Sequence, residues 1–360
     1  MDKPKRLRPG DKVAIVSLSS GVLGEKFVAH EIELGEKRLK EFGLEPVYMN
    51  NSLKGLKFLN ENPKARAEDL KQAFADNNIK AIICAIGGND TFRTIPFLLE
   101  DDEFVELVNN NPKIFMGFSD TTINHLMFHK LGLNTFYGPA FLVDFAELDK
   151  EMLPYTKNAI NYLFNPIENY KIKSSDTWYE DRTNFSVNAV GTPRKSHAET
   201  RGIDLLQGSG KVVGLLLGGC IDSFGLLLGL RENEDIDATS AKEIANKYNI
   251  FPTDWENKIM FFETSESKMN PEFLRKIIKE LKNRHVFDRL SGIVVGKPDD
   301  ETFYDEYRKV LKEEFSNFDF PVLLNLNFGH ASPRTIIPYG ATAEIDADLK
   351  TFTLLKTTID

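Results

Sequence analysis

Three residues whose side chains can do chemistry each follow a short apolar run that is typical of a β-strand. They are Ser119, Glu263 and His330, and the runs before them cover 114–117, 258–262 and 321–326. In α/β proteins, catalytic groups gather just beyond the carboxyl ends of the strands. The chain order of serine, acid and histidine also matches one known class of serine hydrolase, although a triad is defined by geometry. The pattern predicts a hydrolase in which a serine attacks the substrate.

The segment around Ser119 has the pattern of a nucleophile elbow. The apolar run ends in Gly117-Phe118-Ser119-Asp120 and passes directly into a helix-like stretch. A serine on such a sharp turn presents its hydroxyl away from the backbone, and the amide N–H groups at the helix start point toward a developing oxyanion. Thr121 stands where the familiar motif has a second glycine. A serine that only caps a helix is the alternative interpretation.

A neighbouring imidazole must take the proton of the serine, because a serine hydroxyl is a poor nucleophile at neutral pH. His330 is the preferred base among the six histidines, since a predicted strand delivers it. The acid must hold the other ring nitrogen and stabilise the imidazolium. Glu263 fits this role, and Glu266 and Asp120 are the alternatives.

Backbone N–H groups of Gly88 and Asp120 are the predicted oxyanion donors. Gly87-Gly88 follows a predicted strand and lets the backbone approach a substrate closely. Asp120 lies at the start of the helix, where its side chain can anchor the turn while its N–H donates.

The sequence predicts neither a metal nor a cofactor. His125 and His129 share a helix face, but no third ligand is near them in the sequence, and the two cysteines lack Cys-x-x-Cys spacing. The loop 87–90 does not have the spacing of a dinucleotide-binding turn, and 21–26 fails the P-loop pattern. A nucleotide-dependent enzyme is therefore disfavoured.

Composition indicates an ordinary globular protein. The 360 residues are 28% charged and 41% hydrophobic, and the formal net charge is −9. That charge argues against a nucleic-acid partner. The longest apolar run, 212–230, contains Gly218, Gly219 and Asp222, so we expect a buried strand, turn and helix and no membrane partner. No secretory signal is recognisable at the amino terminus, which predicts a cytoplasmic protein.

Strand and helix patterns alternate through the first half of the chain. Runs at 12–17, 80–86 and 114–116 predict strands, and 31–42 and 65–77 predict helices. This alternation favours a doubly wound parallel sheet with helices on both faces.

A change of composition divides the chain. We expect an α/β domain over 1–165 that carries the nucleophile, and a domain over 211–360 that carries the acid and the histidine. Polar residues dominate 166–210, which predicts a linker or a substrate loop, and the acidic stretch 232–237 predicts a further excursion. Trp178 lies in the first of these polar segments and is placed to stack on a purine, although a partly buried loop anchor is the alternative.

Eight short motifs follow one another in register over nearly the whole chain. They are Gly10-Asp11-Lys12-Val13-Ala14-Ile15-Val16, Ala85-Ile86-Gly87-Gly88-Asn89-Asp90, Gly117-Phe118-Ser119-Asp120-Thr121-Thr122, Tyr137-Gly138-Pro139, Leu217-Gly218-Gly219-Cys220, Phe262-Glu263, Gly292-Ile293-Val294-Val295-Gly296 and Asn327-Phe328-Gly329-His330. In these motifs the chain resembles the LD-carboxypeptidase family of serine peptidases, which includes the microcin C immunity peptidases.

The resemblance implies a fold, a triad and a choice of substrates. It implies an amino-terminal domain of the flavodoxin or glutamine-amidotransferase kind and a smaller mixed α/β domain. Ser119 is then the nucleophile, His330 the base and Glu263 the orienting acid, with Asn89 and Trp178 as substrate-binding residues.

Two substrate classes are open within this chemistry. LD-carboxypeptidases release terminal D-alanine from murein tetrapeptides in peptidoglycan recycling. Microcin C immunity peptidases instead detoxify an aminoacyl or peptidyl nucleotide conjugate by cleaving its amide bond. The loop around Asn89 and the segment before Glu263 resemble the immunity branch more closely. Members of the family are often homodimers. A non-catalytic binding protein on the same fold is the third hypothesis.

Overall fold

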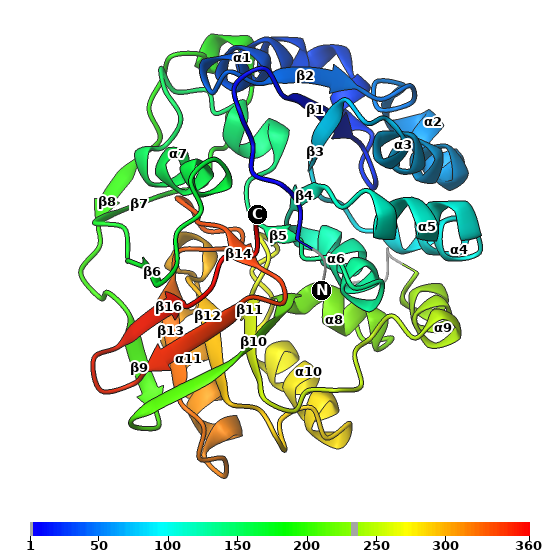
Figure 1. Ribbon diagram of the computed structural model, residues 1–360. Coiled ribbons are helices and arrows are strands. Elements are labelled where there is room, and N and C mark those ends of the chain that lie inside the picture. The colour runs from blue at the N-terminus through cyan, green and yellow to red at the C-terminus, as the bar shows by residue number, and fades with distance from the viewer. Residues whose placement is uncertain (1–2, 232–236) are drawn as a thin grey trace.

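The computed structural model describes residues 3–231 and 237–360, and two sheets organise it (Figure 1). The strands of the first sheet are β1 (Lys12–Val16), β2 (Glu45–Tyr48), β3 (Ile79–Cys84), β4 (Ile114–Gly117), β5 (Phe136–Tyr137) and β14 (Ile337–Pro338). Their order is β14-β5-β4-β3-β1-β2, and every pair is parallel except β14 with β5. The order β2-β1-β3-β4-β5 is the doubly wound flavodoxin arrangement, so the predicted fold class is confirmed.

The helices of the amino-terminal half connect these strands. They are α1 (Ala29–Glu41), α2 (Gly55–Glu61), α3 (Pro63–Ala75), α4 (Ile95–Leu99), α5 (Asp102–Asn110), α6 (Thr122–Lys130) and α7 (Pro154–Ile160). The chain moves from β1 to β2 in one direction and from β3 to β4 in the other. Because such crossovers are right-handed, α1 and α5 cover opposite faces of the sheet.

The second sheet has eight strands and carries most of the carboxy-terminal half. The strands are β6 (Tyr170–Ile172), β9 (Asp204–Gln207), β10 (Lys211–Cys220), β11 (Lys258–Glu263), β12 (Gly292–Gly296), β13 (Val322–Leu326), β15 (Thr342–Asp346) and β16 (Thr351–Leu354). Their order is β6-β16-β15-β10-β11-β12-β13-β9, with β10 to β13 parallel and the flanking pairs antiparallel. This half is mixed α/β, as expected, and its sheet has more described strands than the first sheet.

Four helices belong to the carboxy-terminal half. They are α8 (Ile221–Leu227), α9 (Ala238–Tyr248), α10 (Pro271–Asn283) and α11 (Tyr304–Phe315). In α10, proline occupies the first turn, and the Asn270 side chain caps it by accepting from the N–H of Glu272. The buried Leu274, Ile278 and Leu281 lie on one face of this helix.

Two expectations need adjustment. Residues 166–210 hold β6, β9 and the hairpin of β7 (Thr177–Tyr179) with β8 (Ser196–Ala198), so part of this segment is built into the second sheet. In the apolar run 212–230, β10 continues through Gly218 and Gly219 and α8 follows directly, without a separate turn.

Most of the predicted acidic excursion 232–237 lies outside the described residues. Within the described chain, no helix is both long and apolar enough to cross a bilayer.

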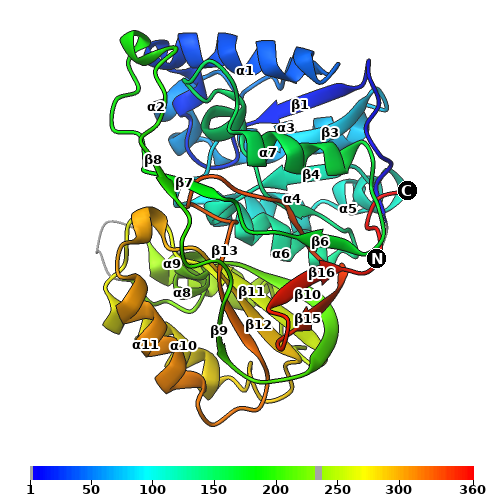
Figure 2. The same cartoon turned by 90° about the vertical axis from the view of Figure 1, so that its left-hand side faces the viewer.

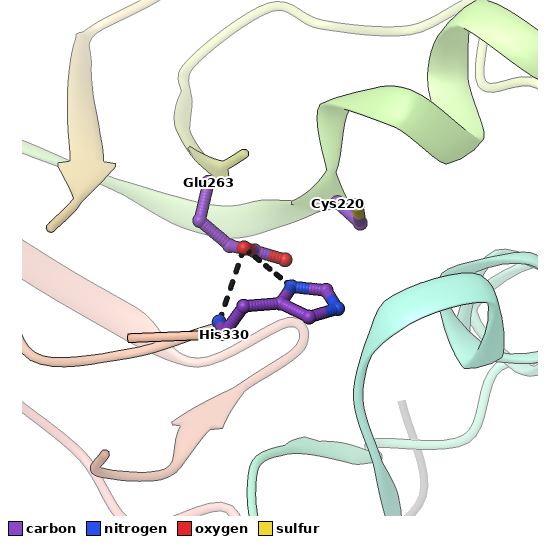
Figure 3. Close-up of side chains that lie close together, drawn as sticks. All are labelled: Cys220, Glu263 and His330. Atoms are coloured by element: carbon purple, nitrogen blue, oxygen red, sulfur yellow. Dashed lines mark hydrogen bonds and ion pairs between the residues drawn. The ribbon is translucent and has the colours of Figure 1, made fainter. Parts of the chain in front are cut away.

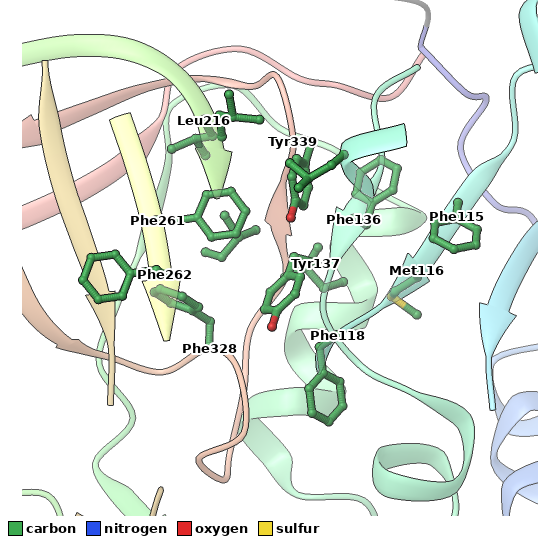
Figure 4. Packing of buried hydrophobic residues seen from close by; sticks show 14 of the residues in the cluster. Phe115, Met116, Phe118, Phe136, Tyr137, Leu216, Phe261, Phe262, Phe328 and Tyr339 are labelled. Atoms are coloured by element: carbon green, nitrogen blue, oxygen red, sulfur yellow. The ribbon is translucent and has the colours of Figure 1, made fainter. Parts of the chain in front are cut away.

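Aromatic side chains join the two halves. Figure 2 shows the first sheet and its helices above the second sheet, with the β7–β8 hairpin at the junction. Tyr137 of β5 lies between Phe118 of the first half and Phe261 of the second (Figure 4). The ring centroids of Phe261 lie 5.7 Å from Tyr137 and 5.0 Å from Tyr339, and all three rings are fully buried. The carboxyl ends of β4 and β11 therefore meet across a shared core.

Candidate active site

Ser119 stands on a strained turn between β4 and α6. Its φ is +66°, a conformation that costs a non-glycine residue about 1–3 kcal/mol. Two glycines make room for the turn: a Cβ at Gly87 would lie 2.6 Å from the Ser119 Cβ, and one at Gly117 would lie 2.9 Å from the Cys84 Cβ. This is the geometry of a nucleophile elbow, and the surrounding packing maintains its strain.

Glu263 and His330 form a buried pair at the ends of β11 and β13. The Oε2 atom of Glu263 is 2.8 Å from the Nδ1 atom of His330 and accepts from the His330 backbone N–H at 3.2 Å (Figure 3). Gly329, with φ +85°, permits this approach, because a Cβ there would lie 2.1 Å from the Glu263 Cγ. The carboxylate fixes the orientation of the imidazole.

Tyr137 links the serine turn to this pair. Its hydroxyl donates to the Oε1 atom of Glu263 at 2.5 Å and accepts from the Ser119 backbone N–H at 3.1 Å. Burial, together with the charge on Glu263, raises the pKa of Tyr137 well above its ordinary value, so the phenol keeps its proton. Sequence reasoning missed this role, and the Tyr137-Gly138-Pro139 motif was the only signal for it.

Glu266 contacts the second ring nitrogen of His330. The Nε2 atom of His330 is 2.8 Å from the Oε2 atom of Glu266, whose side chain is 63% exposed. Burial alone would lower the pKa of His330, but Glu263 and Glu266 outweigh it and hold that pKa well above its ordinary value. His330 is therefore an imidazolium in this arrangement, and among the described contacts both its ring nitrogens face carboxylates.

Cys220 lies beside the Glu263–His330 pair, and the three side chains are of types that can bind a metal ion. Its Sγ atom, a carboxylate oxygen of Glu263 and a ring nitrogen of His330 lie within 4.8 Å of one another (Figure 3). Burial and the charge on Glu263 raise the pKa of the Cys220 thiol well above its ordinary value. The Glu263 carboxylate and the His330 Nδ1 atom are already paired with each other, and this hydrogen-bonded pair fits acid–base chemistry.

His125 and His129, which share α6, support the structure in different ways. His125 is fully buried, and its ring nitrogens lie 2.8 Å from the Thr135 Oγ1 and 2.9 Å from the Gly117 carbonyl oxygen. Burial lowers the pKa of His125 to about 3, so the ring is neutral and holds the end of β4. Burial also lowers the pKa of His129.

Asp120 anchors the elbow through its side chain. Its Oδ2 atom accepts from the Ser19 hydroxyl at 2.5 Å and from the Thr91 N–H at 3.2 Å. Burial raises the pKa of Asp120 to about 6, because the hydrogen bonds offset only part of the desolvation cost. The side chain of Asp120 is thus used for structure.

Two cavities flank Ser119. One has a volume of about 260 Å³ and the other about 570 Å³, and both are lined by Gly88, Ser119 and Glu266. Asn89 and Asp120 line the smaller cavity, while His330 lines the larger one. Ser119 therefore borders two separate spaces.

Family models match both halves of the chain. The model for the LD-carboxypeptidase N-terminal domain matches residues 13–138, and that for the LD-carboxypeptidase C-terminal domain matches 213–345. The chain belongs to the LD-carboxypeptidase family. This family membership makes the protein an enzyme, a hydrolase of the peptidase kind.

Relatives fall on both branches of the LD-carboxypeptidase family. The chain is 27% identical to the microcin C7 self-immunity protein MccF of Escherichia coli, over 81% of this chain and 78% of that protein. It is 26% identical to a probable murein peptide carboxypeptidase of Bacillus subtilis, over 97% and 93%. A crystal structure of an MccF-like protein from Streptococcus pneumoniae in complex with AMP superposes with a TM-score of 0.88 at 47% identity, covering 95% of this chain and 98% of that one.

Trp178 lies away from these cavities in this LD-carboxypeptidase family member. It stacks on His197 across the β7–β8 hairpin, with ring centroids 4.2 Å apart, and the Lys297 Nζ lies 5.2 Å from its ring. Two other aromatic residues, Phe27 and Phe185, line the larger cavity and are 62% and 54% exposed. Sequence reasoning missed both, because a single exposed phenylalanine gives no recognisable pattern.

Proposed function

We propose that this enzyme hydrolyses an amide bond with Ser119 as nucleophile, His330 as general base and Glu263 as the group that orients the imidazole. The observation that carries this proposal is the buried Glu263–His330 pair, joined through Tyr137 to the backbone of the strained serine. A histidine held by a carboxylate, beside a serine on a sharp turn, is the arrangement that activates a hydroxyl.

The proposed reaction begins when the substrate displaces Glu266 from the Nε2 atom of His330. As Glu266 leaves, the imidazolium loses its Nε2 proton to solvent. The neutral imidazole then takes the proton of Ser119 as the serine Oγ attacks the amide carbonyl. Backbone N–H groups of Gly88 and Asp120 stabilise the oxyanion. The imidazolium then gives its proton to the leaving amine, and water hydrolyses the acyl-enzyme by the reverse proton path.

The larger cavity favours a conjugate with a flat ring as the substrate. Its exposed rings, Phe27 and Phe185, are suited to stacking, which contributes about 1–3 kcal/mol per base in nucleic-acid sites. The Streptococcus pneumoniae relative was crystallised with AMP, which supports the same class. We therefore infer that an aminoacyl or peptidyl nucleotide-like conjugate is cleaved.

A murein tetrapeptide that ends in D-alanine is the second candidate. The smaller cavity beside Ser119 is lined by polar groups of Asp222, Ser265 and Ser267, which suit the peptide on the acyl side of the bond, and D-alanine would then lie in the larger cavity. The Bacillus subtilis relative is described as a probable murein peptide carboxypeptidase.

Mass spectrometry on the purified protein tests both candidates. The substrates are an aminoacyl sulfamoyl adenosine and a murein tetrapeptide, and the control is Ser119→Ala. Release of the amino acid from the adenosine supports the nucleotide-conjugate amidase, and loss of D-alanine alone supports the murein carboxypeptidase. Cleavage of neither substrate, with the serine variant identical to the wild type, would contradict the proposed function and support the binding-protein hypothesis. Equal cleavage by both proteins would remove Ser119 from the mechanism.

A further inference from the structure

Arg334 is fixed beside the candidate base His330 and the ring of Phe118. Its guanidinium carbon lies 4.3 Å from the centroid of the Phe118 ring, next to Ser119 in the chain. Its Nη2 atom donates to the His330 carbonyl at 2.9 Å and to the Ser332 hydroxyl at 3.2 Å. The side chain is 2% exposed, so its position is set by packing on one side and hydrogen bonds on the other.

One donor atom of the Arg334 guanidinium, Nη1, has no acceptor among the described residues. The Nη1 and Nε atoms of Arg334 are buried and have no hydrogen-bond partner among the described residues. The Nε atom does form an ion pair, 3.4 Å from the Asp144 Oδ1. Nη1 has no such contact among the described ion pairs, and Arg334 lines the larger cavity together with Ser119 and His330. A buried charged donor without an acceptor is costly, which indicates that a ligand supplies the acceptor.

The other two arginines of this cavity are held by a protein carboxylate. Arg182 Nη2 and Arg194 Nε lie 2.7 Å and 2.6 Å from the two oxygens of Glu147, whose side chain is 2% exposed. Both arginines line the same cavity as Arg334. The Nε atom of Arg182 also has no hydrogen-bond partner among the described residues, but its guanidinium is held at Glu147. Arg334 differs in that its guanidinium contacts His330 and the Phe118 ring, next to Ser119 in the chain.

We propose that Nη1 of Arg334 binds an anionic oxygen of the substrate, in the part that lies in the larger cavity beside the amide bond. The inference rests on the proposed function and specifies its substrate: the group beyond the scissile bond carries a negative charge, as a phosphoryl-type group or as a carboxylate. A planar guanidinium fixed by packing gives a directed, charge-assisted hydrogen bond to either group.

Matched substrate pairs test this charge recognition. One pair is an aminoacyl sulfamoyl adenosine, which is anionic at its linker, and the same aminoacyl group on 5′-amino-5′-deoxyadenosine, which is neutral there. The other is a tetrapeptide ending in D-alanine and its D-alaninamide form. Arg334→Met should lower kcat/KM about 10- to 100-fold for the anionic member of the pair that the enzyme uses and about 2-fold or less for the neutral member. The pair that responds identifies the source of the charge.

Two further variants control the measurement. Arg334→Lys keeps the charge and should recover part of the loss for the anionic member. Arg308→Met removes a guanidinium that is paired with Asp204, outside the residues that line either cavity, and should leave both members unchanged. Equal losses for anionic and neutral substrates in Arg334→Met would show a purely structural role and overturn the inference, while hydrolysis itself would still stand.

Binding separates this inference from the proposed function. Calorimetry on Ser119→Ala, with and without Arg334→Met, compares AMP with adenosine and the tetrapeptide with its amide. A preference for the anionic ligand that disappears in the double variant supports Arg334 even if no substrate is hydrolysed. The absence of any charge preference in both ligand pairs refutes the inference.

Discussion

Glu266→Gln tests whether an exposed carboxylate restrains the catalytic base. The substitution keeps the shape and the hydrogen-bond acceptor beside His330 but removes the charge 2.8 Å from Nε2. Glu263 still holds the other ring nitrogen. The pKa of His330 should therefore fall, because one of the two carboxylates that hold it well above its ordinary value is gone.

The size of the effect follows from the exposure of Glu266. Two unit charges 4 Å apart attract by about 4 kcal/mol at a dielectric of about 20, but exposed pairs contribute only about 0.2–1 kcal/mol. The Glu266 side chain is 63% exposed, so the lower range applies. Taking about 1 kcal/mol, the balance between the imidazolium and the neutral imidazole of His330 should shift about fivefold toward the neutral form.

The assay is the pH dependence of kcat/KM, which reports groups of the free enzyme. The neutral imidazole is the active form, so activity is lost as the pH falls through the pKa of His330. Lowering that pKa moves the acid limb to lower pH, and the variant should be about fivefold faster than the wild type on this limb. At pH values above the acid limb, kcat/KM of the variant and of the wild type should be equal. An acid limb that stays in place, or moves to higher pH, refutes the argument.

The same variant tests the choice of acid. If Glu266→Gln lowers kcat at every pH more than Glu263→Gln does, Glu266 is the orienting acid and the assignment of Glu263 is wrong. Circular dichroism of both variants checks that the comparison is made on folded protein.

Three further predictions concern neighbouring groups. Glu263→Gln should lower kcat by roughly 10²–10⁴-fold, because the imidazolium loses its charged partner, and steady-state kinetics measures this; near-normal kcat contradicts it. Tyr137→Phe removes the hydroxyl that pairs with a buried Glu263 oxygen and with the Ser119 N–H. The free energy of unfolding, measured in urea, should therefore fall by about 1–3 kcal/mol. An unchanged unfolding midpoint would show that the Tyr137 hydrogen bonds are dispensable. Phe185→Ala should raise KM for an adenosine conjugate more than Trp178→Ala does, because only Phe185 of the two lines a cavity beside Ser119. A larger effect of Trp178→Ala would make Trp178 the stacking residue.

Local patterns in the sequence were sufficient for the elements that carry the chemistry. The apolar runs before Ser119 and Glu263 predicted β4 and β11. These strands depend on residues that are close together in the sequence, so hydrophobic periodicity identifies them. The strands of 166–210 are only three or four residues long, too short for alternation to be recognised.

The contacts between distant elements were decided only in the tertiary structure. Tyr137 and Glu263 are 126 residues apart, and their hydrogen bond exists because β5 and β11 meet across the shared core. The approach of Glu266 to Nε2 of His330 and the unpartnered Nη1 of Arg334 have the same origin. By itself, the sequence determined which residue types stand at the ends of the strands, because that information is local. Which of them face one another depends on how the two sheets pack, and packing is a property of the whole chain.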